Sequence, residues 1–240
     1  MEHPTCLNCD NPVSKNFCEV CGQRTNTHRI DFKSFFLHDL VHGVWHLDRG
    51  ILFTTKETFT RPGKAALDYI SGKRVRYYNV FYLTLLALGL SFSVSHFLDG
   101  YLPHTDEKIP TVFAFLIDNL KWFIVGMIPF IAFNGYGIMD RLHLNLAEHF
   151  IIAGICLLGS TLLSFPAILF SFLAEKTGYA LFEILSVVVA ALIIFFPVYV
   201  YANASSEKYR WWELLWRFLL FYTILMIQGS LVASLLLLFW

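Results

Sequence analysis

The chain has 240 residues, with 18 basic and 18 acidic side chains and a formal net charge of zero. Hydrophobic residues make up 56% and charged residues only 15%, against about a quarter charged in ordinary soluble domains. This composition excludes an ordinary soluble globular surface, and the lack of a basic excess argues against a nucleic-acid partner. We therefore expect a protein of the lipid bilayer that binds no nucleic acid.

Residues 1–29 carry two Cys-x-x-Cys pairs, a spacing typical of a metal site. The expected metal ligands are Cys6, Cys9, Cys18 and Cys21. Four thiolates complete the tetrahedral coordination of zinc and leave no open position, so we expect one structural zinc ion. Metal binding would fold a segment with almost no hydrophobic core of its own, and Gly22 would permit the turn after the second pair.

Disulfides or a redox dithiol are the alternatives for these four cysteines, and iron could occupy the same cage. Disulfides are uncommon in a reducing cytosol, and a redox motif needs only one pair. Cys156 lies alone in an apolar run, where we expect it to be inert packing.

Residues 30–79 predict an amphipathic helix followed by a basic collar. A helix that begins at Asp31 would carry apolar side chains on one face and His38, His42 and His46, the histidine stripe, on the other. With about sixteen residues it is too short and too polar to cross a bilayer, so we expect it at the membrane surface. The stripe could bind a metal, because histidines four residues apart can share one, but a solvated polar face is the simpler explanation.

The basic collar follows a helix break at Pro62 and Gly63 and leads into the first long apolar run. Each basic side chain near an anionic bilayer surface gains about 1 kcal/mol, so the collar is expected to contact lipid headgroups. Its members are Arg61, Lys64, Lys73, Arg74 and Arg76.

Residues 80–240 predict an all-α polytopic membrane bundle with about five transmembrane helices. The expected spans are about 80–98, 119–138, 150–173, 179–202 and 214–240. The second is the weakest, because Asp118 and Lys121 interrupt it. Small residues recur about every four positions in the third and fifth spans and predict helix-packing faces there. They are Gly154, Gly159, Ser160 and Ser164 in the third, and Gly229, Ser230, Ala233 and Ser234 in the fifth.

The distribution of Lys and Arg predicts how the bundle is oriented. Most basic residues fall on one side if the N-terminus is cytoplasmic, and basic residues favour that side. The first thirty residues contain no apolar stretch typical of a signal peptide. We therefore expect a bacterial inner (cytoplasmic) membrane protein with a cytoplasmic N-terminus and a periplasmic C-terminus, which also keeps the four cysteines in a reducing compartment.

Three motifs resemble an uncharacterised Bacteroidetes-type membrane protein family, domain of unknown function 3667. They are Phe-Cys-x-x-Cys-Gly-Gln at 17–23, Arg-Pro-Gly at 61–63 and Tyr-Ile-x-Gly-Lys-Arg-x-x-Tyr at 69–77. The resemblance covers about residues 5–98, and Glu148-His149 is also similar to that family. It implies an inner-membrane location and a zinc-ribbon-like head, and it implies no reaction.

Catalytic signatures are lacking, since the chain has no Gly-rich phosphate loop and no Gly-x-Ser-x-Gly elbow. Glu148 and His149 could relay protons or bind a metal with His143, but a helix cap by Glu148 explains the pair better.

Three functions stay open, in descending order of preference. The first is a non-enzymatic scaffold or regulator whose zinc head and collar dock a cytoplasmic protein partner or anionic lipids. The second is a small transporter or transporter accessory with proline-kinked spans. The third is a metal-dependent membrane enzyme acting on lipids, in which the histidine stripe would converge with Glu148 and His149 on a metal ion.

Overall fold

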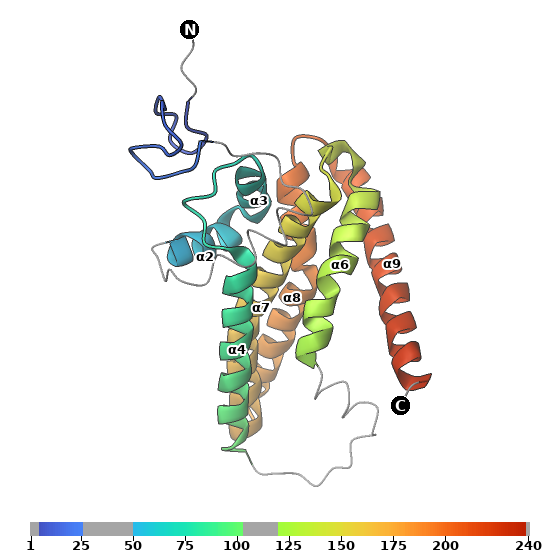
Figure 1. Ribbon diagram of the computed structural model, residues 1–240. Coiled ribbons are helices and arrows are strands. Elements are labelled where there is room, and N and C mark those ends of the chain that lie inside the picture. Colours follow the sequence, from blue (N-terminus) through green and yellow to red (C-terminus); the bar gives the residue numbers. More distant parts are fainter. Residues whose placement is uncertain (1–4, 26–49, 103–119, 239–240) are drawn as a thin grey trace.

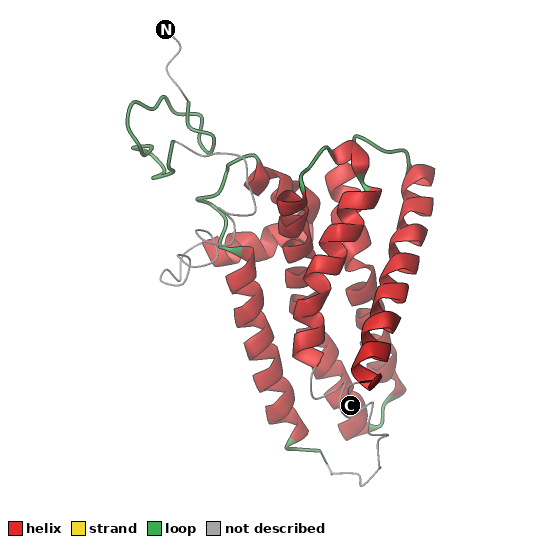
Figure 2. Cartoon of the chain, turned by 45° about the vertical axis from the view of Figure 1, so that its right-hand side comes forward, coloured by secondary structure: helices red, strands yellow, loops and turns green. Residues whose placement is uncertain are grey.

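The protein is described here by a computed structural model, which places residues 5–25, 50–102 and 120–238. Within these ranges the chain forms helices and loops and no strand, which confirms the all-helical prediction (Figure 2). The helices are α2 (Gly50–Thr60), α3 (Pro62–Ile70), α4 (Val80–Asp99), α6 (Leu120–Ile138), α7 (Leu146–Thr177), α8 (Ala180–Ser205) and α9 (Trp211–Leu238).

Four of the described helices are long and apolar enough to cross a membrane. They are α4, α7, α8 and the Trp211–Val232 part of α9, and they coincide with the first, third, fourth and fifth expected spans. Helix α6 occupies the position of the second expected span and lies in the same bundle, but it is not among these four (Figure 1). The histidine stripe, His38, His42 and His46, lies outside the described residues.

Helix α7 is the central element of the bundle, because it packs against α4, α6 and α8. A Cβ added to Gly159 would overlap the ring of Phe196 on α8, and Ser164 hydrogen-bonds Ser91 on α4 at 3.1 Å. The small residues of the third span therefore form the predicted packing face. At Gly229 in the fifth span no described atom lies within 4 Å of an added Cβ, so the packing face predicted there stays a prediction.

Short polar residues set the helix ends. The side chain of Asn79 accepts hydrogen bonds from the amides that follow it and caps the start of α4. Asn145 and Glu148 form a reciprocal capping box at the start of α7. Gly178 ends α7 with a positive φ of 69°, which gives the tight turn into α8.

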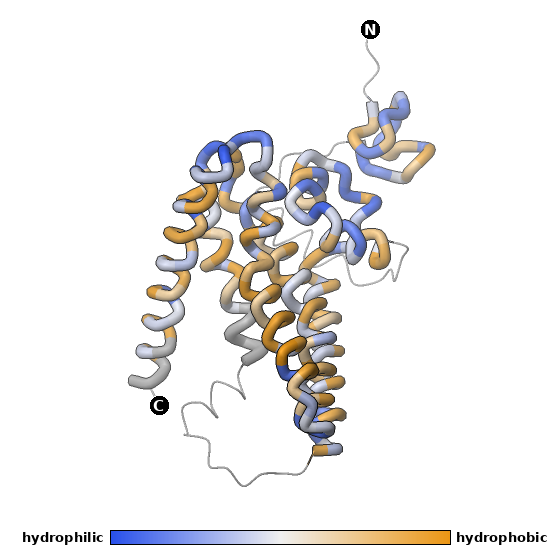
Figure 3. Tube along the Cα trace, turned by 180° about the vertical axis from the view of Figure 1, so that it is seen from behind, coloured by the Kyte–Doolittle hydropathy of each residue, from blue (hydrophilic) through white to orange (hydrophobic). Residues whose placement is uncertain are grey.

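The two ends of the bundle differ in polarity. Figure 1 shows residues 5–25, α3 and the α6–α7 and α8–α9 connections at one end, which we call the head end. The α7–α8 turn and the C-terminal end of α9 lie at the other. Hydrophilic residues gather at the head end, whereas the helices below it are largely hydrophobic (Figure 3). Helix α2 lies crosswise at the head end, below α3 and level with the start of α4 (Figure 1).

Candidate metal centre and the polar cluster beside it

Residues 5–25, which we call the head, consist of two similar turns. In the first, the amide of Asp10 donates to the carbonyl of Cys6 (2.9 Å), and in the second, the amide of Gly22 donates to that of Cys18 (2.9 Å). Asp10 and Gly22 each follow the second cysteine of a pair, and both have a positive φ, 57° and 74°. Gly22 thus makes the turn that the sequence predicts.

The two turns bring their four cysteines together. The sulfur atoms of Cys6, Cys9, Cys18 and Cys21 all lie within 4.8 Å of one another, and all four are free thiols. The Sγ atoms of Cys6 and Cys21, and those of Cys9 and Cys18, are 3.5 Å apart. Four sulfurs bound tetrahedrally to zinc at about 2.3 Å would be about 3.8 Å apart. The cluster is therefore compatible with a single four-coordinate metal ion.

The protonation of the cluster also suits a cation. Burial alone would raise the pKa of Cys21, but hydrogen bonds from the Gln23 backbone, Asn8 and neighbouring thiols lower it to about 6. At Cys9, the backbone of Asn11 lowers the pKa, but burial and hydrogen bonds with the other thiols raise it to about 12. Adjacent thiols thus resist full ionisation, and a bound divalent cation would favour the thiolate form of all of them.

Two side chains of the head bind the loop at residues 71–79, which we call the α3–α4 loop. The amide nitrogen of the buried Gln23 side chain donates to the carbonyl of Gly72, and its oxygen accepts from the amide of Arg74 (3.2 Å). The oxygen of Asn8 accepts from Nε of Arg76 (3.2 Å). This contact could not be predicted from the sequence, because the partners of Gln23 lie about fifty residues away and no local pattern marks them.

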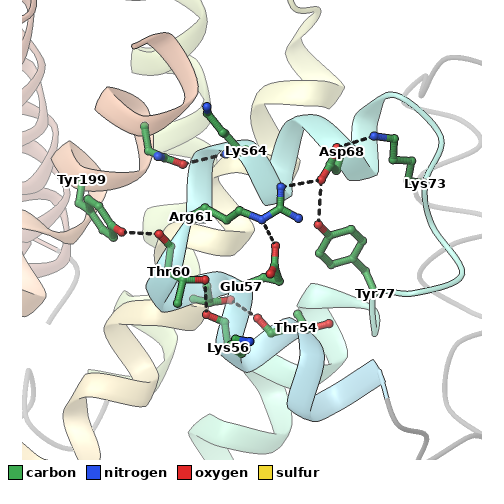
Figure 4. Close-up of polar contacts among 12 residues, drawn as sticks. Thr54, Lys56, Glu57, Thr60, Arg61, Lys64, Asp68, Lys73, Tyr77 and Tyr199 are labelled. Carbon is green, nitrogen blue, oxygen red and sulfur yellow. Dashed lines mark hydrogen bonds and ion pairs between the residues drawn. The ribbon is translucent and has the colours of Figure 1, made fainter. Parts of the chain in front are cut away.

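Side chains of α2, of α3, of the residue between them and of the α3–α4 loop form a polar cluster (Figure 4). Arg61 pairs with Glu57 and with Asp68 (3.2 Å), and Asp68 also binds Lys73 (3.0 Å) and accepts from the hydroxyl of Tyr77 (3.3 Å). Burial raises the pKa of Asp68, but the Lys73 hydrogen bond and the charges of Lys73 and Arg61 outweigh it and hold the pKa below its ordinary value. Asp68 is therefore an ionised hub of the cluster.

The basic collar is largely engaged within the chain. Arg61 and Lys73 belong to the polar cluster, and Nζ of the half-exposed Lys64 lies 3.7 Å from Glu207. The guanidinium groups of Arg74 and Arg76 lie over the rings of Tyr69 and Tyr77, at 5.7 Å and 6.0 Å from the ring centres. Contact of these residues with lipid headgroups stays a prediction.

The α2–α3 junction is docked on α8. Pro62 is the first residue of α3, as expected for a helix break, but Gly63 lies inside α3 and faces the backbone of Val200 and Ala204. The backbone amide of Lys64 donates to the side chain of Asn203 (2.9 Å), a contact visible in Figure 4. Gly63 is thus required for a close helix contact, a role that the sequence analysis did not assign to it.

Glu148 and His149 are both buried near the head end of α7. Glu148 accepts from the amide of Asn145 (2.8 Å) in the capping box, which confirms the helix-cap interpretation. Nδ1 of His149 lies 3.3 Å from the hydroxyl of Tyr201 on α8. Among the described residues, only the four cysteines form a group suited to a metal, so the structure does not bring Glu148 and His149 into one.

Comparison with known families agrees with the resemblance noted from the motifs. Residues 48–92 match the family described as a protein of unknown function (DUF3667). This stretch contains α2, α3, the α3–α4 loop and the first part of α4, and therefore the whole polar cluster. The four cysteines lie outside it. No curated protein and no solved structure matches the chain.

Proposed function

We propose that this chain is an integral membrane protein acting as a non-enzymatic scaffold or regulator, with one structural zinc ion in its head. The observation that supports this most is the link between the cysteine cluster and the bundle. Gln23 and Asn8, each next to or near a cysteine ligand, hydrogen-bond the α3–α4 loop, which leads directly into α4. A head folded by metal would thereby hold the entry to the first apolar helix in place.

In this proposal the chain crosses a bacterial inner membrane five times, with α6 as the additional span. The N-terminus is cytoplasmic and the C-terminus periplasmic. The arrangement of the bundle supports this, because the head and the end of α9 lie at opposite ends (Figure 1). Arg141, Lys208 and Arg210 lie in or beside the head-end connections, whereas Lys176 lies at the far end, as expected if the head end is cytoplasmic.

The head end is also where we propose that the partner binds, either an anionic lipid surface or a cytoplasmic protein. The ion pairs of Arg61 and Lys73 with acidic side chains reduce the net charge of the polar cluster. Lys64 likewise pairs with the acidic Glu207. Headgroup contact therefore falls mainly to Arg74 and Arg76, whose contacts with aromatic rings leave their positive charge in place. The transporter and lipid-enzyme alternatives gain no specific support, since Glu148 serves as a helix cap.

The test begins with the metal content of the full chain, purified in detergent. We expect one zinc ion per chain in the natural protein and less than one in Cys18→Ser, because three thiolates bind zinc less well than four. A second metal equivalent would favour the enzyme alternative, and a metal-free natural protein would refute the zinc head.

Hydrogen exchange then tests the link itself. Gln23→Ala should retain zinc but exchange faster at residues 71–79, because the amides of Arg74 and Val75 and the carbonyl of Gly72 each lose one hydrogen bond. Glu19→Ala is the matched control, since Glu19 pairs only with the exposed Lys15 within the head. Equal exchange at residues 71–79 in the two variants would show that the head does not act on the loop.

A further inference from the structure

Helix α2 buries three polar side chains and exposes two large apolar ones, an arrangement that differs from that of a helix on a water-soluble protein. Its inward face carries Thr54, Glu57 and Thr58, whose exposures are 1%, 7% and 1%. Its outward face carries Leu52 and Phe59, which are 80% and 39% exposed, together with the exposed Lys56 and Thr60. A surface helix in water turns its apolar residues inward and its polar residues outward. The medium outside α2 should therefore be apolar.

The inward polar face is supplied with partners by the chain itself. The hydroxyl of Thr54 accepts from the amide of Tyr78 (2.8 Å), and the hydroxyl of Thr58 donates to the carbonyl of Thr54 (2.8 Å). Glu57 pairs with Arg61 in the polar cluster (Figure 4). These contacts give each of the three inward polar side chains a partner within the chain, which reduces the cost of placing α2 in a medium with little water.

The position of α2 along α8 gives its depth. The ring centre of Phe59 lies 6.1 Å from that of Phe196. The backbone carbonyl of Phe59 accepts a hydrogen bond from the hydroxyl of Tyr199 (3.0 Å). Since α8 ends at Ser205, these residues lie about 14 Å and about 9 Å below its end, at about 1.5 Å per residue. Interfacial helices bury their apolar face about 5–10 Å into the boundary between headgroups and acyl chains. With the end of α8 placed at the membrane surface, the C-terminal end of α2 thus lies at or below that level.

We propose that α2 is an interfacial helix whose outward face, Leu52 and Phe59, contacts the acyl chains of the bilayer and separates the polar cluster from lipid. With 11 residues α2 is too short to cross the membrane, so it enters from the head end only. The exposed Lys56 can extend its ammonium group toward the headgroups. This inference rests on the proposed insertion of the bundle in a bilayer.

Photocrosslinking of the full chain tests the inference. p-Benzoylphenylalanine replaces Leu52 or Phe59, and the protein is reconstituted in nanodiscs of phosphatidylethanolamine and phosphatidylglycerol. Two exposed valines serve as references: Val187 on the apolar helix α8 as the positive control, and Val20 on the head as the negative one. Leu52 is so exposed that its replacement leaves the core unchanged.

We expect lipid adducts at positions 52 and 59 within about twofold of those at 187 and about tenfold above those at 20, by mass spectrometry. Adducts at 187 but not at 52 or 59 would overturn the inference and leave the membrane bundle intact. Crosslinks from 52 to protein instead of lipid would also overturn it. A lack of adducts at 187 would refute the proposed insertion itself.

Discussion

Replacing Gly63 with alanine should weaken the attachment of α3 to α8. The added Cβ would lie 2.7 Å from the Cα of Ala204 and closer still to the Ala204 amide nitrogen and the Val200 carbonyl oxygen. Carbon atoms in contact prefer about 3.5–4.0 Å, so the helices must separate by about 1 Å. All three obstructing atoms belong to the backbone and cannot rotate away. Overpacking of this kind costs about 1–3 kcal/mol, more than the gain of at most about 1 kcal/mol from alanine in a helix.

The matched control is Gly89→Ala in α4, where an added Cβ meets no atom within 4 Å. Thermal unfolding in detergent, followed by circular dichroism, should show a lower midpoint for Gly63→Ala and an equal or higher midpoint for Gly89→Ala. Hydrogen exchange should also rise within α3 (Pro62–Ile70) in the Gly63 variant only. If the two variants were equally stable and equally protected in α3, the close approach of α3 to α8 would be wrong.

Two further predictions concern polar contacts in different parts of the bundle. The pKa of Asp68 is lowered from 3.8, so its carboxylate stabilises the docked α3 above that pH, and this contribution is lost as the pH falls through the lowered value. The exchange rate of α3 amides, corrected for the pH dependence of intrinsic exchange, should therefore rise as the pH falls from about 5 to about 3. In Asp68→Asn, α3 should be poorly protected at both pH values and show no such dependence. If the variant showed the same pH dependence as the natural protein, another group would be its cause. Asn134 on α6 and Gln228 on α9 exchange two side-chain hydrogen bonds, 2.9 and 3.0 Å long, so Gln228→Leu should lower the free energy of unfolding by about 0.6–2 kcal/mol. In a double-mutant cycle, Asn134→Leu combined with Gln228→Leu should lower the free energy of unfolding by less than the sum of the two single substitutions. Strictly additive losses would show that the pair does not interact.

Local sequence patterns predict much of the fold. The spacing of the cysteine pairs, with Gly22 after the second, predicts two tight turns that bring four sulfurs together, because each turn is closed by bonds within six residues. Long apolar runs predict α7 and α8 because their length alone suits a bilayer. Asn145 and Glu148 mark the start of α7 by a pattern only four residues long.

Contacts between distant segments could not be predicted in the same way. Gln23 binds a loop far along the chain, and Gly63 faces a helix that begins more than a hundred residues later. The collar residue Arg61 pairs with Glu57 one helical turn away, and the sequence does show this spacing. The prediction that the collar contacts lipid headgroups did not take this pair into account. The polarity of α2 was not predictable, because its eleven residues show which faces differ but not which one faces the bundle.

The central place of α7 has a consequence for biosynthesis. Helices α4 and α6 both pack on α7, yet both leave the ribosome before it. About fifty residues separate the end of α4 from the start of α7, which at about 5–20 residues per second means a delay of about 3–10 seconds. During that interval Ser91 of α4 lacks its partner Ser164, and α4 must be stabilised by lipid or by the insertion machinery. Assembly of the bundle is thus governed by the arrival of its third long helix.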